Sequence, residues 1–212
     1  MIRLCSFRVK NNLDRFAGSH LLEITVSNTS INIIYILGTK TSLDSLSKNL
    51  KKGSLPLDGL KVSKEWKQAK IEDPNFEFFF EYDEFVKNYS IPVFKSKDLS
   101  LEKPTACLVY KFFSSSFGGG LGEYFEVLSK KHPGLQFIIT WLIPDLGEVG
   151  RENQINGGIE DQQVIERDKN KASLKDYLKY SKLWFEYEFD DDFFDEYGGK
   201  DAKKLKEFYL KC

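Results

Sequence analysis

Cysteine and histidine are scarce in this chain of 212 residues, which excludes several classes of site. Its three cysteines, Cys5, Cys107 and Cys212, lie far apart and form no C-x-x-C pair. The two histidines, His20 and His132, cannot complete a conventional metal site by themselves. We therefore expect no zinc site, iron–sulfur cluster or disulfide framework. A single disulfide remains open, but reduced thiols in a reducing compartment fit the count better.

Long apolar segments are absent as well. Uncharged apolar runs, such as residues 31–37, fall far short of the ~20 residues that cross a bilayer. Basic residues interrupt the apolar ones at positions 1–10, so the N-terminus lacks the apolar core of a signal peptide. We expect a cytoplasmic protein with no membrane contact.

Excess charge of either sign is also absent, because the formal net charge is −1. Residues 134–212 are acidic, with 17 acidic and 12 basic side chains, and no basic footprint stands out. We therefore expect no nucleic-acid partner. A hydrophobic content of 41% and an aromatic content of 15% suffice for a packed core with strands. The length suits one α+β domain over residues 1–212, or two sub-units, 1–104 and 105–212.

The pattern that is present predicts alternating strands and helices. Residues 106–113 and 135–143 are apolar enough for strands, and residues 123–132 have a helical apolar face. Asn156-Gly157-Gly158 predicts a hairpin turn between strands at 148–153 and 159–165. The other predicted elements are a hairpin of 21–26 with 31–37, a helix from Thr41 or Ser42 to about residue 52, a strand at 75–82, a helix at 173–185 capped by Ser173 and a helix at 200–210. This order predicts an α+β fold, an antiparallel sheet with helices mainly on one face.

Residues 107–158, about a quarter of the chain, carry a resemblance to a known family. A strand opens into a Ser/Gly loop, a helix ends in KKHPGLQF (residues 130–137), and a strand and a glycine-containing hairpin follow. This resembles the ferredoxin-like domain of small uncharacterised proteins of phages and mobile elements, in which a helix ending K-x-P-x-L-x-F leads into a strand. Where that family usually has Trp-Ser-Pro before the helix, this chain has SSSF at residues 114–117. The resemblance implies a split β-α-β sheet and no activity.

The glycine-rich loop at residues 114–122 is the first candidate site. It follows a strand and opens a helix, where backbone N–H groups and the helix dipole can hold an anion. The loop lacks the Lys-Ser/Thr of a nucleotide-binding P-loop and has Glu123 after its last glycine. A plain strand-to-helix connection is therefore the competing interpretation. The residues that would hold an anion are Ser114, Ser115, Ser116, Gly118, Gly119 and Gly120.

The second candidate is the segment 186–197, which holds seven acidic side chains and otherwise only aromatic ones. Aromatic residues ringed by acids suit an interface with a basic partner, although a solvated loop anchored by core aromatics is the simpler interpretation. The order of acids in a calcium-binding EF-hand is absent, so we expect no metal. The residues proposed to bind a partner are Glu186, Glu188, Asp190, Asp191, Asp192, Phe193, Phe194 and Asp195.

No set of residues has the pattern of a catalytic site, and none predicts a cofactor. Together these observations predict a non-enzymatic binding or interaction protein, such as an accessory protein of a mobile element or an immunity-type partner of a toxin. The alternative is a domain or enzyme that binds a phosphorylated ligand through the loop 114–122.

Overall fold

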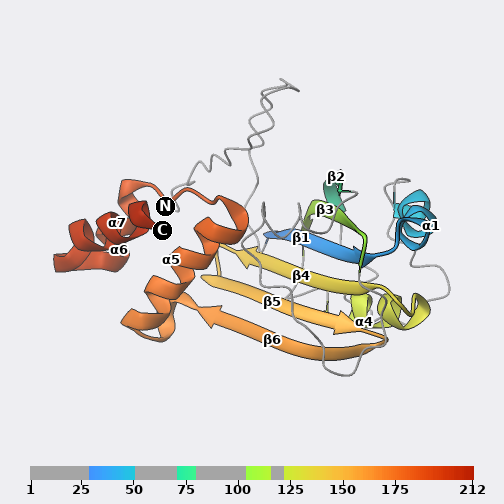
Figure 1. Ribbon diagram of the computed structural model, residues 1–212. Coiled ribbons are helices and arrows are strands. Elements are labelled where there is room, and N and C mark those ends of the chain that lie inside the picture. The colour runs from blue at the N-terminus through green and yellow to red at the C-terminus, as the bar shows by residue number, and fades with distance from the viewer. Residues whose placement is uncertain (1–28, 51–70, 80–103, 116–121) are drawn as a thin grey trace, which may run out of the picture.

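The computed structural model describes residues 29–50, 71–79, 104–115 and 122–212, and their strands form one antiparallel sheet (Figure 1). The sheet has six strands in the order β2-β3-β1-β4-β5-β6. The strands are β1 (Thr29–Gly38), β2 (Ile71–Phe79), β3 (Ala106–Ser115), β4 (Gln136–Ile143), β5 (Glu148–Ile155) and β6 (Gly158–Glu166). The described helices are α1 (Lys40–Leu50), α4 (Gly122–Lys131), α5 (Lys171–Phe185), α6 (Asp191–Gly198) and α7 (Ala202–Lys211), with short 3₁₀ turns at Arg167–Lys169 and Gly199–Asp201. The expected α+β class with an antiparallel sheet is confirmed.

The strand β1 lies inside the sheet, between β3 and β4. Its sequence alternates large apolar residues on both sides, so Tyr35 faces one layer of the core while Ile34 and Ile36 face the other. Because β3 and β4 occupy both of its edges, the predicted hairpin with residues 21–26 is wrong as a pairing of this strand. Residues 21–26 themselves lie outside the described residues.

The first four strands interleave two β-α-β units. Along the chain the described elements run β1-α1-β2-β3-α4-β4, while across the sheet the strands run β2-β3-β1-β4. The hairpin of β5 and β6 then widens the sheet beyond β4. Because β1 is inserted between two later strands, both halves of the chain contribute to one sheet. This arrangement favours a single domain over two sub-units divided at residue 104. The single domain stays a prediction.

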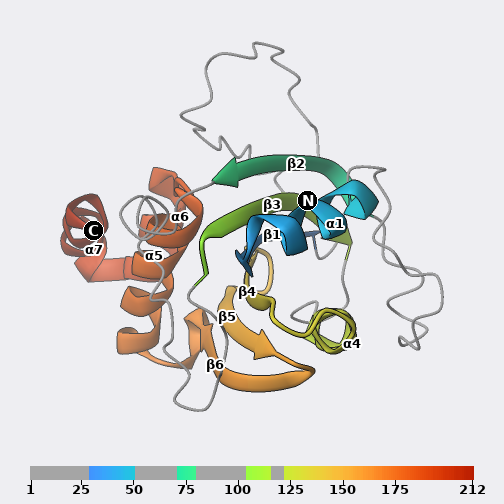
Figure 2. The ribbon, with the colours of Figure 1, turned by 45° about the vertical axis from the view of Figure 1, so that its right-hand side comes forward.

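Helices cover both faces of the sheet, so the expectation of helices mainly on one face is wrong (Figures 1 and 2). On one face α1 and α4 bury Leu43 and Phe125 against strand residues such as Ile139. On the other face α5 buries Tyr177 and Trp184 against β1, β4, β5 and β6. The physical reason is the alternation in the central strands, which presents an apolar surface on each side and needs a cover for both.

Local interactions account for the turn between β5 and β6 and for the starts of α1 and α5. The predicted hairpin turn is confirmed: Asn156 and Gly157 have φ values of 53° and 79°, as a type I′ turn requires. The helix caps differ from those expected. Thr39, and not Thr41 or Ser42, caps α1, since its Oγ1 accepts the backbone N–H of Ser42 at 3.3 Å. Likewise Asn170 Oδ1, and not Ser173, accepts the first free N–H groups of α5, at 2.9 and 3.0 Å.

Candidate functional site

The glycine-rich loop is described only at its ends. Ser114 and Ser115 finish β3, where Ser114 is aligned with Ser30 of β1 and Ile71 of β2. The helix α4 begins at Gly122. The other predicted anion-binding residues, Ser116 and Gly118–Gly120, lie outside the described residues. The loop therefore joins a strand to a helix N-terminus as expected, and the anion hypothesis stays a prediction.

The acidic-aromatic segment contains a helix start that the sequence interpretation missed. Asp190 caps α6, since its Oδ1 accepts the backbone N–H of Phe193 at 2.9 Å. Asp191 and Asp192 follow in the first turn, where the positive end of the helix dipole favours carboxylates. The cluster of aspartates thus has a local role in starting α6, independent of any partner.

The aromatic residues of this segment form a core of their own. The ring of Phe189 lies 4.3 Å from that of Phe193 and 5.6 Å from that of Tyr209. Phe194 is only 2% exposed and packs with Leu178 and Leu205. Phe194 is therefore not accessible to a partner in this structure, and Phe193 is half-buried.

The acidic side chains of the segment, by contrast, are exposed. Around α6 the carboxylates and the aromatic rings lie on opposite sides, because the aromatic residues 193, 194 and 197 share one face of the helix. Asp191 forms an ion pair with Lys206 of α7. The exposed acids are Glu186, Glu188, Asp190, Asp191, Asp192, Asp195 and also Glu196, which the sequence interpretation did not include. We call the outward-facing carboxylates of α6, Asp192, Asp195 and Glu196, the acidic side.

The helices α6 and α7 are attached through α5 and through one arginine. Figure 1 shows α6 and α7 beyond α5, on the side away from the strands. The guanidinium of Arg167 lies 4.0 Å from the centre of the Tyr197 ring and pairs with Asp168 at 2.8 Å. On α5, Lys182 Nζ donates to the carbonyl oxygens of Tyr209 and Leu210 at 2.9 and 3.2 Å, which caps the end of α7. The acidic side is thus held on a fixed helix.

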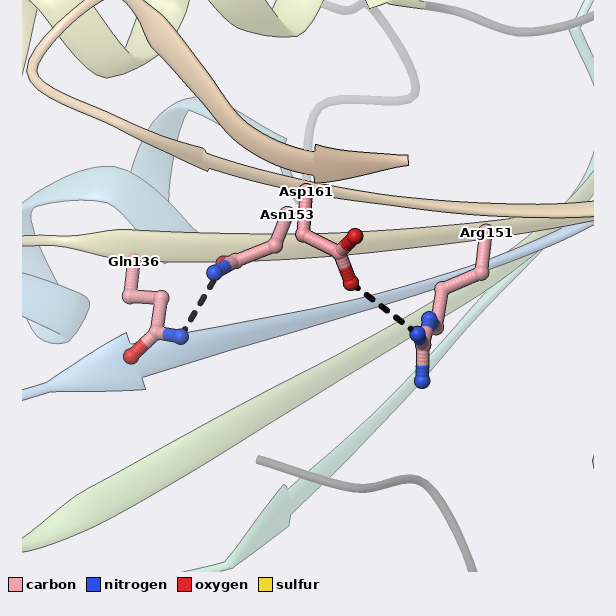
Figure 3. A network of polar contacts seen from close by, with 4 residues as sticks. All are labelled: Gln136, Arg151, Asn153 and Asp161. Atoms are coloured by element: carbon pink, nitrogen blue, oxygen red, sulfur yellow. Dashed lines mark hydrogen bonds and ion pairs between the residues drawn. The ribbon is translucent and has the colours of Figure 1, made fainter. Parts of the chain in front are cut away.

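A second polar group, in β5, is one that the sequence interpretation missed entirely. Arg151, Glu152, Asn153 and Gln154 are consecutive and almost fully buried, Arg151 at 6% exposed and Glu152 at 3%. Figure 3 shows two contacts on the α5 face of the sheet: Arg151 Nη2 pairs with Asp161 Oδ2 of β6 at 3.1 Å, and Gln136 Nε2 of β4 donates to Asn153 Oδ1 at 3.0 Å. These contacts join β5 to both of its neighbours.

On the α4 face, Glu152 is the buried charge. Its carboxylate accepts hydrogen bonds from Gln162 Nε2 at 3.0 Å and from Gln154 Nε2. Burial raises the pKa of Glu152, and the nearby carboxylate of Glu126 raises it further. On the other face, Asn153 Nδ2 is buried with no hydrogen-bond partner within the described chain. Nothing in the run R-E-N-Q distinguishes an internal strand from an exposed one, so the sequence offered no signal for this group.

Other features of the described residues add no site. No three His, Cys, Asp or Glu side chains gather closely enough there to hold a metal ion. Within the same ranges, no helix combines the length and apolar character needed to cross a membrane. Cys107 is buried in β3 and Cys212 is exposed at the end of α7. Comparisons with protein-family models, curated proteins and solved structures find no match to this chain.

Proposed function

We propose that this chain is a non-enzymatic interaction protein that binds a basic partner protein through the acidic side of α6. The supporting observation is the division of α6 into an outer row of carboxylates and an inner row of packed rings. Because the packed rings hold the helix in place, the backbone that carries the carboxylates needs no rearrangement when a partner binds, which lowers the entropic cost of binding. A row of like charges also speeds encounter with an oppositely charged surface.

The biological setting and the fold family belong to the same proposal. An accessory protein of a mobile element, or an immunity-type protein that neutralises a basic toxin in the cytoplasm, would need such a surface. The ferredoxin-like assignment is supported by the β-α-β-β-α-β order of β1 to β4 and by the central position of β1 and β3.

The experiment compares what the full-length chain captures from lysate of its source cells. The test variant is Asp192→Asn/Asp195→Asn, which removes two charges from the acidic side without touching the Asp190 cap. The matched control is Glu166→Gln/Asp176→Asn, two exposed acids outside α6. We expect a basic protein that the wild type and the control recover and the test variant loses. Equal recovery by all three proteins would contradict the proposal.

The alternative function, binding of a phosphorylated ligand at residues 114–122, is favoured by one observation: α4 begins at Gly122, directly after this loop. A thermal-shift series with ATP, a sugar phosphate and inorganic phosphate at millimolar concentration tests it. A ligand that binds the folded state must raise the melting temperature, so an unchanged melting temperature with all three compounds rules this alternative out.

A further inference from the structure

One side of α5 carries a row of lysines. Lys171, Lys175, Lys179 and Lys182 follow one another at spacings of four, four and three residues. With 3.6 residues per turn, they lie within about 80° of one another around the helix, and the first three are about 6 Å apart along its axis. The only acid of α5, Asp176, lies on another side of the helix by the same geometry.

The helix α7 adds lysines beside this row. Lys204, Phe208 and Lys211 share one side of α7, because their spacings are four and three. Two contacts place that side next to the row on α5. Lys175 Nζ lies 5.5 Å from the centre of the Phe208 ring. The carboxylate of Asp201 lies 3.4 Å from Lys171 Nζ and 3.6 Å from Lys204 Nζ.

These side chains form one exposed basic surface, which we call the basic seam. Its members are Lys171, Lys175, Lys179, Lys204 and Lys211, all exposed. The side chains of Lys171 and Lys204 are 94% and 83% exposed, and Asp201 is a single carboxylate shared between them. Lys182 is excluded, because its ammonium group donates to the last carbonyls of α7.

The basic seam and the acidic side of α6 lie on different sides of α7. Lys206, which pairs with Asp191 of α6, is about 160° around α7 from Lys204. The acidic excess of residues 134–212 therefore conceals a local separation of charge. The expectation of no nucleic-acid partner rested on the charge balance and on the lack of a basic footprint in the sequence, and neither describes this surface, which two helices form together.

We propose that the basic seam binds the phosphodiester backbone of a nucleic acid. Lysines are point charges that hold phosphates without reading bases, and the row of lysines on α5, with two further lysines on α7, matches a repeating anion. The ring of Phe208, which is half-buried and lies beside Lys175, adds an aromatic group to this surface, and bases of a single strand stack on such groups. This binding is independent of the acidic side of α6 and goes beyond the proposed function.

The test is fluorescence anisotropy of the full chain with a labelled 20-nucleotide single-stranded oligothymidine and, in a second arm, a duplex of equal length. We expect a Kd between about 10⁻⁴ and 10⁻⁶ M at physiological salt, and tighter binding at lower salt. If all five lysines contact phosphates of the single strand, log K should fall with log salt at a slope of about −3.5. Absence of binding to both nucleic acids at ~50 mM salt overturns the proposal.

Variants separate the basic seam from general charge. Lys175→Gln/Lys179→Gln should make the salt slope shallower by about 1.4, and Lys204→Gln/Lys211→Gln should act alike. The control Lys130→Gln/Lys131→Gln, two exposed lysines of α4, should leave the slope unchanged. A control that weakens binding as much as the test variants overturns the proposal. So does polyglutamate that competes as well as the oligonucleotide at equal charge, since the partner is then an acidic protein.

Discussion

In β5, four consecutive polar side chains are buried on the two faces of the sheet, whereas on α6 the polar side chains are exposed and the aromatic ones are buried or half-buried. The polar groups of β5 act within the molecule, since Arg151 reaches β6 and Asn153 accepts from β4. The carboxylates of α6 and the lysines of the basic seam face solvent. The difference teaches that the buried polar groups of β5 join strands, while the charges of the C-terminal helices are exposed to solvent.

The largest effect should come from removing the core of those helices. Phe194→Ala should destabilise the packing of α6 and α7 by about 3–5 kcal/mol, because a buried aromatic ring is lost. Amide hydrogen exchange should show lost protection in α6 and α7 while β1, β3 and β4 keep theirs. The half-buried Phe208→Ala is the milder control. Equal loss of protection in the sheet would show that the two regions are one cooperative unit.

A smaller effect should follow from adding one methyl group to the sheet. A Cβ at position 150 would overlap the indole ring of Trp141, whose Nε1 donates to Glu148 Oε1 at 2.7 Å. Gly150→Ala should therefore lower the free energy of unfolding by about 1–3 kcal/mol in a urea titration. At Gly158 the nearest atom to an added Cβ is 3.6 Å away, so Gly158→Ala should change stability little. Equal stability of both variants would mean that Trp141 repacks freely.

The cap of α6 should contribute less. Asp190→Ala removes the acceptor of the Phe193 N–H and should cost about 1 kcal/mol, with reduced helicity by circular dichroism. Asp195→Ala, on the same helix but with an exposed side chain, should stay within about 0.5 kcal/mol of the wild type. If Asp195→Ala lowers the free energy of unfolding as much as Asp190→Ala does, the exposed acids of α6 stabilise the fold. Polar side chains of α6 would then act within the molecule, as those of β5 do.

The smallest effect, and the one that depends on pH, concerns Glu152. Its pKa in the folded chain is raised above the ordinary 4.5, so the folded state holds this proton more tightly than the unfolded chain does. Ionisation of Glu152 therefore lowers stability as pH rises from below 4.5 through the raised pKa. Glu152→Gln lacks this loss, so its stability relative to the wild type should improve with rising pH across that window. Urea midpoints at several pH values measure it, and a difference independent of pH would show that Glu152 is well solvated.

Much of the sheet could be predicted from local sequence, because the signals were local. The apolar run of β4 predicts a buried strand, and Asn156-Gly157 predicts a tight hairpin turn, without information from the rest of the chain. The apolar residues on both faces of β1 also indicated that helices cover both faces of the sheet. This could be recognised only once β1 was known to lie between β3 and β4, which follow much later in the chain. The burial of Arg151 and Glu152 could not be predicted, because it depends on helices that are distant in the sequence: Arg151 lies over the ring of Trp184 in α5, and Glu152 lies near Glu126 of α4. The spacing of the lysines in α5 predicts that they share one side of the helix. That the lysines of α7 lie beside them follows only from the packing of the two helices.

The position of β1 also determines when the chain can fold. Ile34 pairs with Tyr110 on one side and with Ile139 on the other. During synthesis, β1 emerges long before either neighbour exists, with an apolar surface on both faces and two open edges. Truncated chains that end before residue 143 should therefore aggregate unless a chaperone shields this strand, and the last neighbour to be made, β4, completes the sheet around it.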